Sequence, residues 1–393
     1  NGYQAYAVGK LHVFPQRNRI GFDDAILSEE GRYEFGIVDD YQIWLGEQGY
    51  PGQEFMHSMG NNTYLTRPWH LPEYLHPTNW VTMEMMKAMK RKDPTRPAFF
   101  FCSYQFPHPP LVPLQTYLDM YDDVVIEEPI EDTWHTEEPL FALLGEDASR
   151  YSKRERERAR KAFYAQCTHI DSQIRLLIGT LRETNLLNDT IIVFMSDHGD
   201  MLFDHKMVAK RCFYESASCV PMVFTGAPMG EYRGKGFEQK LGKMSDVMPT
   251  LLDLCGLEIP HHVEGIPLFS QSENPYIYGE VGEGVKATRM IRTSDFKLIW
   301  YPCDNTFQLF DMKKDRNEVH DLSTLSEFKQ TVENLKKILL DCCYGSDLDW
   351  IEDKEFVGFN FPGKAKAPDF GLYNQRGYHW PAPTGYSNVG KNA

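Results

Sequence analysis

The stretch Ile191-Ile-Val-Phe-Met-Ser-Asp-His-Gly-Asp200 decides the fold class. Its first five residues are apolar without alternation, a pattern typical of a strand covered on both faces, as in a parallel sheet. The run stops at Ser196, and Asp197 and His198 follow at once. Polar residues at the carboxyl end of such a strand lie where open α/β sheets bind their ligands. Gly199 permits the sharp turn that brings the two side chains to one point.

A carboxylate and an imidazole at one point suit a divalent cation. The structural alternative is an Asx turn, in which Asp197 only caps backbone amides at the end of the strand. These ten residues alone do not distinguish a cation site from an Asx turn. The rest of the chain provides the evidence that does.

The composition is that of an ordinary globular protein of 393 residues, with 42% hydrophobic and 25% charged residues. The formal net charge of -15 disfavours nucleic acid and anionic membrane as partners, because both need a basic face. It does not exclude a small anionic substrate, since a pocket can be locally cationic. No apolar run approaches the ~18 residues that span a bilayer. The eight cysteines form no CxxC pair, which favours reduced, buried thiols.

Strands and helices alternate through the first two thirds of the chain, and the order of helix then strand is that of a βαβ crossover. The sequence therefore predicts an α/β fold with a mostly parallel central sheet flanked by helices. The expected strands are 3–8, 98–104, 191–195 and 220–225, and the expected helices are 79–91, 154–187 and 245–254.

From residue 275 the pattern changes to short strands separated by tight turns, followed by one helix. We expect a catalytic α/β domain over residues 1–270, an antiparallel α+β subdomain over 271–345 and an irregular tail over 346–393. The segments 13–78 and 111–150 show little periodicity, and we interpret them as functional loops without a readable specificity code.

Polar residues follow three of the predicted strands. Lys10 and His12 follow the first strand, and His108 follows the second on a loop fixed by prolines. With Asp197 and His198 they would meet at one edge of a parallel sheet. Each residue alone has a plainer interpretation, a solvated lysine or a packed histidine.

Together with Lys210, which lies in the loop after Asp200, these side chains form a cationic pocket beside a metal. Such a pocket fits a tetrahedral oxyanion ester, whose developing charge needs stabilisation. The chemistry also needs a nucleophile, and no Ser or Cys of this chain lies in a convincing setting for one.

These motifs resemble those of the sulfatase family of the alkaline phosphatase superfamily, in the family's order and over almost the full chain. The matching elements are Gly9-Lys10-Leu11-His12 (GKxH), Phe106-Pro107-His108-Pro109-Pro110 (PHxP), Ser196 to Asp200 (SDHG), Ala209-Lys210 with Phe213-Tyr214-Glu215, Asp246 to Gly256, and Arg292 to Lys297.

The resemblance implies a role for each matched residue. Asp197 and His198 would bind a Ca2+-type cation, with Mn2+ or Mg2+ as alternatives. Lys10 and Lys210 would hold sulfate oxygens. His12 would orient the nucleophile, and His108 would contact the sulfate or protonate the leaving group.

The chain departs from the family pattern at its start. In the family an Asp-Asp metal pair and a CxPxR or SxPxR turn, whose Cys or Ser becomes formylglycine, precede the GKxH element. We expect both upstream of residue 1, so that the chain is a fragment, because losing a central strand would leave strand edges unpaired.

The resemblance thus predicts a sulfuric ester hydrolase acting on a small-molecule or carbohydrate sulfate ester. The alternatives are a phosphonate or phosphate mono- or diester hydrolase on the same fold, and a truncated, non-catalytic protein.

Overall fold

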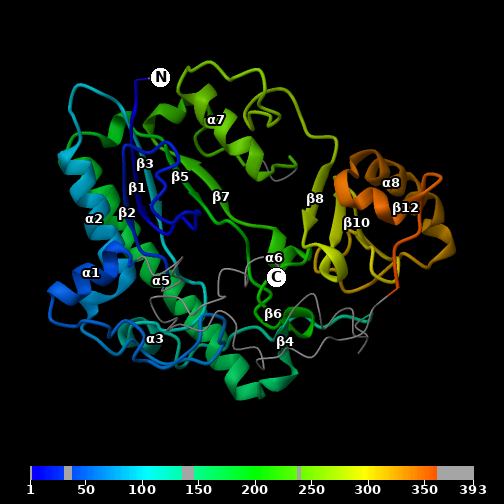
Figure 1. Ribbon diagram of the computed structural model, residues 1–393, viewed down its shortest axis with the longest axis horizontal. Coiled ribbons are helices and arrows are strands. Elements are labelled where there is room, and N and C mark those ends of the chain that lie inside the picture. The colour runs from blue at the N-terminus through cyan, green and yellow to red at the C-terminus, as the bar shows by residue number, and fades with distance from the viewer. Residues whose placement is uncertain (1, 31–37, 135–145, 237–239, 361–393) are drawn as a thin grey trace, which may run out of the picture. The chain divides into compact units, whose positions relative to one another are not determined.

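A computed structural model of the chain describes residues 2–30, 38–134, 146–236 and 240–360 (Figure 1). The chain forms two compact units. The first takes in residues 1–126 and 151–188, and the second takes in residues 127–150 and 189–365. Each is described by itself below. The predicted domain boundaries at residues 270 and 345 stay a prediction.

The first unit is built on a parallel sheet of three strands in the order β2-β1-β3. Its strands are β1 (Gln4–Gly9), β2 (Asp24–Leu27) and β3 (Ala98–Ser103), and its helices are α1 (Asp40–Glu47), η1 (Glu73–Leu75), α2 (Pro77–Arg91), α3 (Gln115–Asp119) and α5 (Lys153–Glu183). The predicted α/β class with a parallel sheet is confirmed.

The long helix α5 begins at Lys153, directly after a residue that can cap a helix N-terminus. Ser152 caps it, and the side chain of Glu155 returns a hydrogen bond to the backbone N–H of Ser152, which completes a capping box. The helix ends at Glu183, four residues before the predicted end. Helix α2 lies against α5 (Figure 1) and buries the apolar face formed by Val81, Met85 and Met89.

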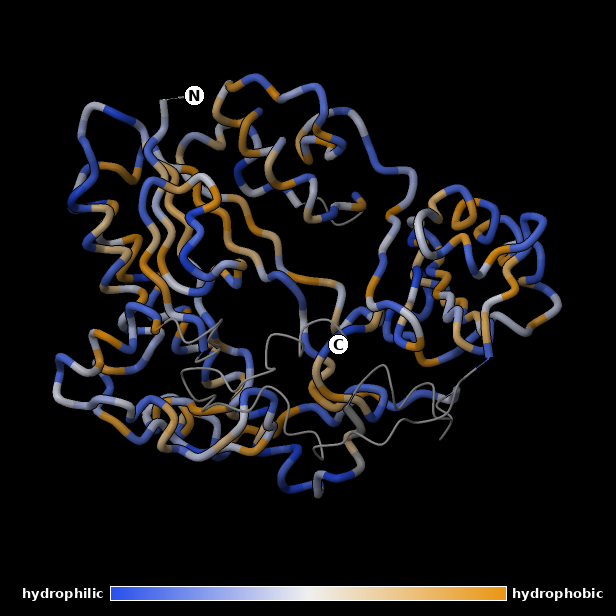
Figure 2. The backbone as a smooth tube through the Cα atoms, viewed as in Figure 1, coloured by the Kyte–Doolittle hydropathy of each residue, from blue (hydrophilic) through white to orange (hydrophobic). Residues whose placement is uncertain are grey.

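One prediction for this unit is wrong. Segment 13–78 is not only loop, because it contains β2 and α1, which are too short to show a period. Strand β3 is hydrophobic from Ala98 to Cys102 (Figure 2), but it is not buried on both faces, since Phe99 is 40% and Phe101 39% exposed. The ring of Phe22 stacks on that of Phe99 at 6.1 Å between centroids and is tilted against that of Phe101 at 5.9 Å.

The second unit contains β5 (Ile192–Met195), which carries the stretch that opens the sequence argument. It pairs with β7 (Met222–Thr225), and the pairing is antiparallel. The expectation of parallel pairing is wrong for this strand, because an apolar run records burial and not the direction of its partner. Phe194 is 43% exposed, so this strand too is only partly covered.

The remaining elements of the second unit are short, apart from one antiparallel sheet in the order β11-β10-β9-β8 with a helix against it. The strands are β4 (Glu146–Asp147), β6 (Met207–Val208), β8 (Ile277–Val281), β9 (Thr288–Arg292), β10 (Phe296–Tyr301), β11 (Thr306–Asp311), β12 (Ile351–Glu352) and β13 (Glu355–Phe356). The α-helices are α6 (Glu215–Ser218), α7 (Val247–Leu254) and α8 (Lys329–Cys342). The 3-10 helices are η2 (Ala148–Arg150), η3 (Leu187–Asp189), η4 (Asp204–Lys206), η5 (Ala227–Tyr232), η6 (Met244–Asp246), η7 (Gly284–Lys286), η8 (Ser326–Phe328) and η9 (Gly345–Trp350).

The antiparallel strands and helix expected within 271–345 are present as β8 to β11 and α8. The tail is less irregular than predicted, because β12 and β13 form a hairpin. The rest of the predicted tail, from residue 361, lies outside the described residues.

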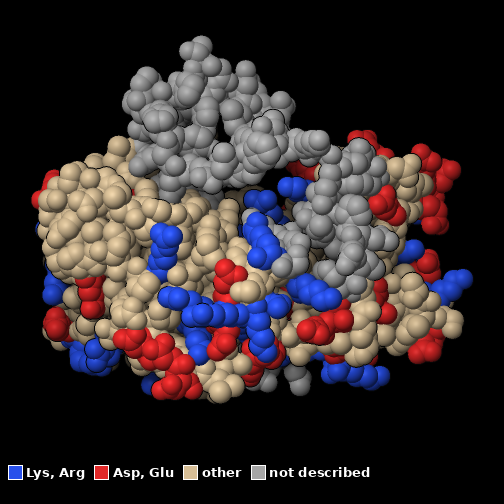
Figure 3. Space-filling view, turned by 90° about the horizontal axis from the view of Figure 1, so that it is seen from below, with Lys and Arg blue, Asp and Glu red and all other residues tan. Residues whose placement is uncertain are grey.

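The cysteines are free, as expected, but fewer are buried than expected. Cys212 and Cys303 are buried, whereas Cys167, Cys219 and Cys255 are exposed. Within the part of the chain that the structure describes, no helix is both long and apolar enough to span a bilayer. Figure 3 shows a face on which basic and acidic side chains are interspersed.

Candidate functional site

The first group of candidate residues lies where β1 ends in Gly9. This glycine has a φ of +103°, and a Cβ built on it would lie 1.8 Å from the carbonyl oxygen of Ser103, so no other residue fits. The close approach lets the backbone N–H of Lys10 donate to the same oxygen at 3.1 Å. The end of β1 is thereby held against the end of β3 directly before the side chain of Lys10.

Lys10 and His108 meet at a residue that sequence reasoning missed, Glu30. The Nζ of Lys10 lies 3.0 Å from Oε1 of Glu30, and Nδ1 of His108 lies 3.7 Å from the same oxygen. All three side chains are largely buried, at 15%, 9% and 4% exposure for Lys10, His108 and Glu30. The first unit therefore brings together two of the predicted residues and adds a carboxylate to them.

Glu30 was missed because no sequence motif marks it. The only signal was the pair Glu29-Glu30, which follows the short strand β2 after Ser28, and that strand itself was not recognised. Two adjacent carboxylates that are 4% and 3% exposed must have partners, since buried charges are paired.

The partner of Glu29 is the backbone of the loop that carries His12. Its carboxylate accepts hydrogen bonds from the N–H of Leu11 at 2.9 Å and from that of His12 at 3.1 Å. His12 is exposed and has a φ of +58°. The structure thus fixes the backbone at His12, while the predicted role of its imidazole stays a prediction.

Asp39 anchors this carboxylate segment to a helix. Its Oδ2 accepts from the N–H of Glu29 at 2.7 Å, and its Oδ1 caps α1 by accepting from the N–H of Gln42 at 2.9 Å. Burial raises the pKa of Asp39 to about 6, because water is excluded from its charged form. The start of α1 therefore holds the segment that reaches Lys10, His12 and His108.

The His108 loop is fixed by its own backbone. The N–H of His108 donates to the carbonyl of Gln105 at 3.2 Å, and its Nδ1 donates to the carbonyl of Pro109 at 2.6 Å. The amide of Gln105 accepts from the hydroxyl of Ser28 at 3.4 Å, which links this loop to the carboxylate segment.

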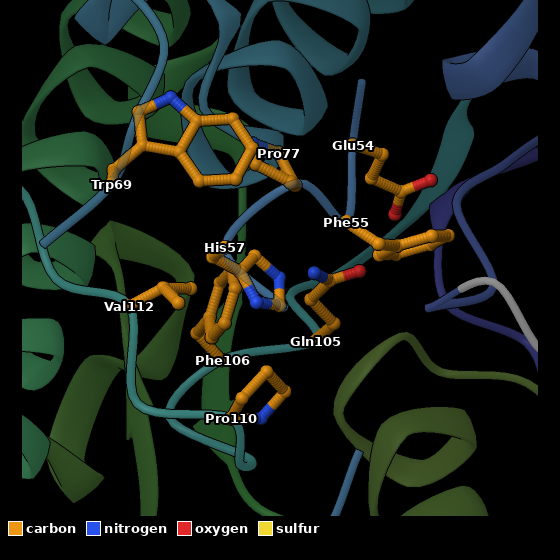
Figure 4. A pocket seen from close by; sticks show the side chains of 9 residues that line it. All are labelled: Glu54, Phe55, His57, Trp69, Pro77, Gln105, Phe106, Pro110 and Val112. Carbon is orange, nitrogen blue, oxygen red and sulfur yellow. The ribbon is translucent and has the colours of Figure 1, made fainter. Parts of the chain in front are cut away.

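A small cavity lies beside this loop (Figure 4) and has a volume of ≈ 10 Å³. Glu54, His57, Trp69, Gln105 and Phe106 are among its lining residues. A space of this size holds about one water molecule and no part of an alcohol. It is therefore a packing feature and not the substrate pocket.

Two tryptophans of this unit belong to the core. Trp69 is 9% and Trp80 1% exposed. His76 is fully buried and caps α2 by accepting from the N–H of Thr78 at 3.2 Å. Burial holds the pKa of His76 well below its usual value, and the neighbouring His169 lowers it further.

The second group of candidate residues lies at the end of β5, in the second unit. A Cβ on Gly199 would lie 2.1 Å from the carbonyl oxygen of Ser216, so the turn after His198 requires glycine. Nε2 of His198 lies 3.5 Å from Oδ2 of Asp197, whose side chain is 73% exposed. The turn thus presents a carboxylate and an imidazole side by side to solvent.

The hydrogen bonds of His198 show whether this pair fits a cation. Its Nδ1 lies 2.7 Å from the carbonyl oxygen of Gly199, which can only accept, so Nδ1 carries the proton. In the neutral ring the lone pair of Nε2 then faces the carboxylate of Asp197. Two lone-pair donors that face each other suit a cation between them, and a carbonyl on the second ring nitrogen is the usual support for a metal-binding histidine.

Within the described ranges, no group of three or more His, Cys, Asp or Glu side chains is placed to hold a metal ion. Asp197 and His198 alone do not make up a metal site, although their chemistry suits two of a cation's ligands.

Lys210 lies in the same unit, in the loop after β6. The carbonyl of the preceding Ala209 accepts from the N–H of Met201 at 2.7 Å, which closes the loop that begins at Asp200. The predicted residues are thus divided between the two units: Lys10, His12 and His108 in the first, Asp197, His198 and Lys210 in the second.

Two further family motifs meet inside the second unit and have a structural role. The Nζ of Lys297 is 2.6 Å from Oε1 of Glu215 and 2.7 Å from Oε1 of Glu318, and Lys297 is 1% exposed. The hydroxyl of Tyr214 donates to the amide oxygen of Gln308 at 2.6 Å in the core. The Phe213-Tyr214-Glu215 element and the Arg292 to Lys297 block are therefore parts of one buried polar cluster.

An α/β fold with a lysine and a histidine at one strand edge, and an exposed Asp-His pair at another strand end, is the arrangement expected of a hydrolase of the alkaline phosphatase superfamily. Comparison with known families agrees. The family model described as "Sulfatase" matches residues 1–257, and that described as "N-sulphoglucosamine sulphohydrolase, C-terminal" matches residues 203–343. The chain belongs to the sulfatase family, a class of sulfuric ester hydrolases, and this prediction is confirmed.

Curated relatives share its sequence to different extents. An arylsulfatase of Clostridium perfringens is 35% identical over 86% of this chain and 75% of its own length. A choline-sulfatase of Rhizobium meliloti is 26% identical over 82% of this chain and 65% of its own length. The chain spans only 44% of human arylsulfatase K, to which it is 27% identical.

Solved structures share the fold. The phosphonate monoester hydrolase of Agrobacterium radiobacter aligns with a TM-score of 0.72 at 19% identity, covering 89% of this chain and 80% of its own. A protein in complex with its substrate, D-glucosamine-2-N,6-O-disulfate, aligns with a TM-score of 0.64 at 19% identity, covering 87% and 79%. At this identity the likeness concerns the fold alone.

Proposed function

We propose that the protein hydrolyses sulfate esters of small molecules or carbohydrates with the help of a divalent cation and a formylglycine nucleophile. The observation that carries the proposal is the meeting of Lys10 and His108 at the carboxyl ends of β1 and β3, 3.0 and 3.7 Å from one carboxylate oxygen. Two potential cations at such a strand edge form an anion-binding pair.

The substrate class is supported by the relatives. An arylsulfatase is the relative with 35% identity, and a fold neighbour binds a disulfated glucosamine. An aryl or a carbohydrate sulfate would carry the tetrahedral monoanion for which an anion-binding pair of this kind is suited.

Asp197 and His198 would hold the cation, which we propose to be Ca2+, with Mn2+ or Mg2+ as alternatives. The cation would act as a Lewis acid on a sulfate oxygen when bound. A formylglycine residue would supply the hydroxyl nucleophile of the reaction.

Residues of this chain would stabilise the developing charge, transfer a proton and orient the nucleophile. Lys10 and Lys210 would offset the negative charge that develops on the sulfate oxygens. His108, held through its Nδ1 by the carbonyl of Pro109, would present Nε2 for proton transfer to the leaving oxygen. His12 would orient the nucleophile from a loop whose backbone Glu29 fixes.

The test is turnover of an aryl sulfate by the full-length protein, with metal content measured in parallel. Asp197→Ala should lose both the bound metal and the activity. Its control is Asp189→Ala, an exposed aspartate at the other end of β5, which should keep both. Normal metal content in Asp197→Ala would contradict the ligand assignment.

The second candidate is hydrolysis of phosphonate monoesters, which the fold permits because a phosphonate monoester hydrolase has the same architecture. Comparing turnover of an aryl sulfate with that of an aryl phosphonate monoester by one preparation separates the two. A preference for the phosphonate would replace the proposed activity.

A further inference from the structure

Glu30 stands in an unexpected place, against the two side chains that would bind the substrate anion. Its Oε1 is 3.0 Å from the ammonium of Lys10 and 3.7 Å from Nδ1 of His108. A carboxylate there weakens an anion site unless it has a task of its own, because a like charge at 4–6 Å disfavours any bound anion.

Burial and hydrogen bonds to neighbouring residues hold Glu30 in this position. Glu30 is 3% exposed, and its backbone carbonyl accepts a hydrogen bond from the side-chain amide of Asn61 at 3.4 Å. The preceding residue, Glu29, is fixed on both sides, by Asp39 at its N–H and by the Leu11 and His12 amides at its carboxylate. The backbone before Glu30 is therefore held in place, which keeps the carboxylate of Glu30 beside Lys10.

We propose that Glu30 is a positioning residue that sets the charge of the anion-binding pair, so that the site accepts an ester with one negative charge and rejects an ester with two. The inference rests on the proposed function, because it takes Lys10 and His108 as the pair that binds the substrate anion.

The charges of the three groups carry the argument. The carboxylate of Glu30 offsets the positive charge of the Lys10 ammonium at 3.0 Å and lies 3.7 Å from His108, so it weakens the attraction of this pair for a bound anion. A sulfate monoester carries a single negative charge at neutral pH. A phosphate monoester carries close to two, since its second pKa is near 6, and its additional charge would face Glu30. Specificity of this kind arises from a repulsive element as much as from an attractive one.

The experiment compares two probes of nearly the same shape, methyl sulfate and methyl phosphate, by calorimetric titration of the full-length protein at pH 7.5. The wild type should bind methyl sulfate about tenfold or more tightly than methyl phosphate, as expected for one like charge at contact distance in a partly buried site. Glu30→Gln keeps the hydrogen-bond acceptor for Lys10 but removes the charge. It should reduce that ratio about tenfold, and Glu30→Asp should keep it near the wild-type value.

The matched control is Glu29→Gln, an equally buried neighbour whose carboxylate meets backbone amides. It should weaken both probes by a similar factor and leave their ratio unchanged. An unchanged ratio in Glu30→Gln would overturn the proposal. So would tighter binding of both probes by the same factor, because Glu30 would then only block the site.

A measurement on the wild type keeps the proposal testable if Glu30→Gln does not fold. At pH 5 methyl phosphate is mostly a monoanion, so it should bind about as tightly as methyl sulfate at the same pH. A ratio that stays the same between pH 5 and pH 7.5 would refute the charge argument. Turnover of an aryl sulfate by the same preparation separates the two proposals, because charge-selective binding without turnover would refute the function and leave the role of Glu30.

Discussion

The buried cluster around Lys297 gives the sharpest test of what holds the second unit together. Lys297 is 1% exposed, and its ammonium donates to the carbonyl of Phe213 at 2.7 Å, to Glu215 at 2.6 Å and to Glu318 at 2.7 Å. Lys297→Met keeps most of the apolar stem and removes the charge. Glu318, itself 1% exposed, is then left as a buried carboxylate without its cation.

Breaking a buried ion pair on one side destabilises a protein by about 3–5 kcal/mol, mostly because the remaining charge is uncompensated. For a unit of about 200 residues each kcal/mol lowers the melting temperature by 2–4 °C. We therefore expect Lys297→Met to melt roughly 6–20 °C below the wild type. Thermal and urea unfolding, followed by circular dichroism, measure the loss.

The matched control is Lys313→Met, which breaks a contact of the same length, 2.6 Å to Asp295, between side chains that are 65% and 47% exposed. A solvent-exposed pair of this kind contributes about 0–1 kcal/mol. Adding Glu318→Gln to Lys297→Met should recover part of the loss, because it removes the unpaired charge. A loss below about 1 kcal/mol in Lys297→Met, or no recovery in the double variant, would refute the reasoning.

Three further predictions concern the candidate site and the pH range. His108→Ala should lower kcat on an aryl sulfate by roughly 10²–10⁴ with little change in melting temperature, whereas a large loss of stability with normal turnover would make His108 a packing residue. Lys210→Arg should lose most of the activity, because a forked guanidinium does not replace a compact ammonium, while Arg211→Lys should lose little; similar mild effects on kcat/KM would remove Lys210 from the site. Burial lowers the pKa of His169 from 6.5 to about 4, so its contribution to stability is present above pH 6.5 and is lost as the pH falls toward 4. Urea unfolding of His169→Gln should show a flatter fall in stability over that range than the wild type, and identical slopes would exclude this assignment.

The sequence by itself determined which residues lie at the ends of the main strands. Strands β1, β3, β5 and β7 lie where the apolar runs predicted them, and α2 and α5 match their apolar periods to within a few residues. These features are local, since a run or a period is read within one element. The family followed from short motifs in a fixed order, because each motif is held by backbone geometry near it, as Gly9 and Gly199 show.

Only the tertiary structure decided which groups meet. The antiparallel pairing of β5 with β7 depends on a second strand, and an apolar run does not encode its direction. The contacts of Glu30 with Lys10 and His108 join residues 20 and 78 positions apart along the chain, and the strand that precedes Glu30 is too short to be recognised from the sequence. In the same way Tyr214, Glu215 and Lys297 became a buried cluster and not an extension of the site, because burial and pairing are properties of the folded chain and not of any one segment.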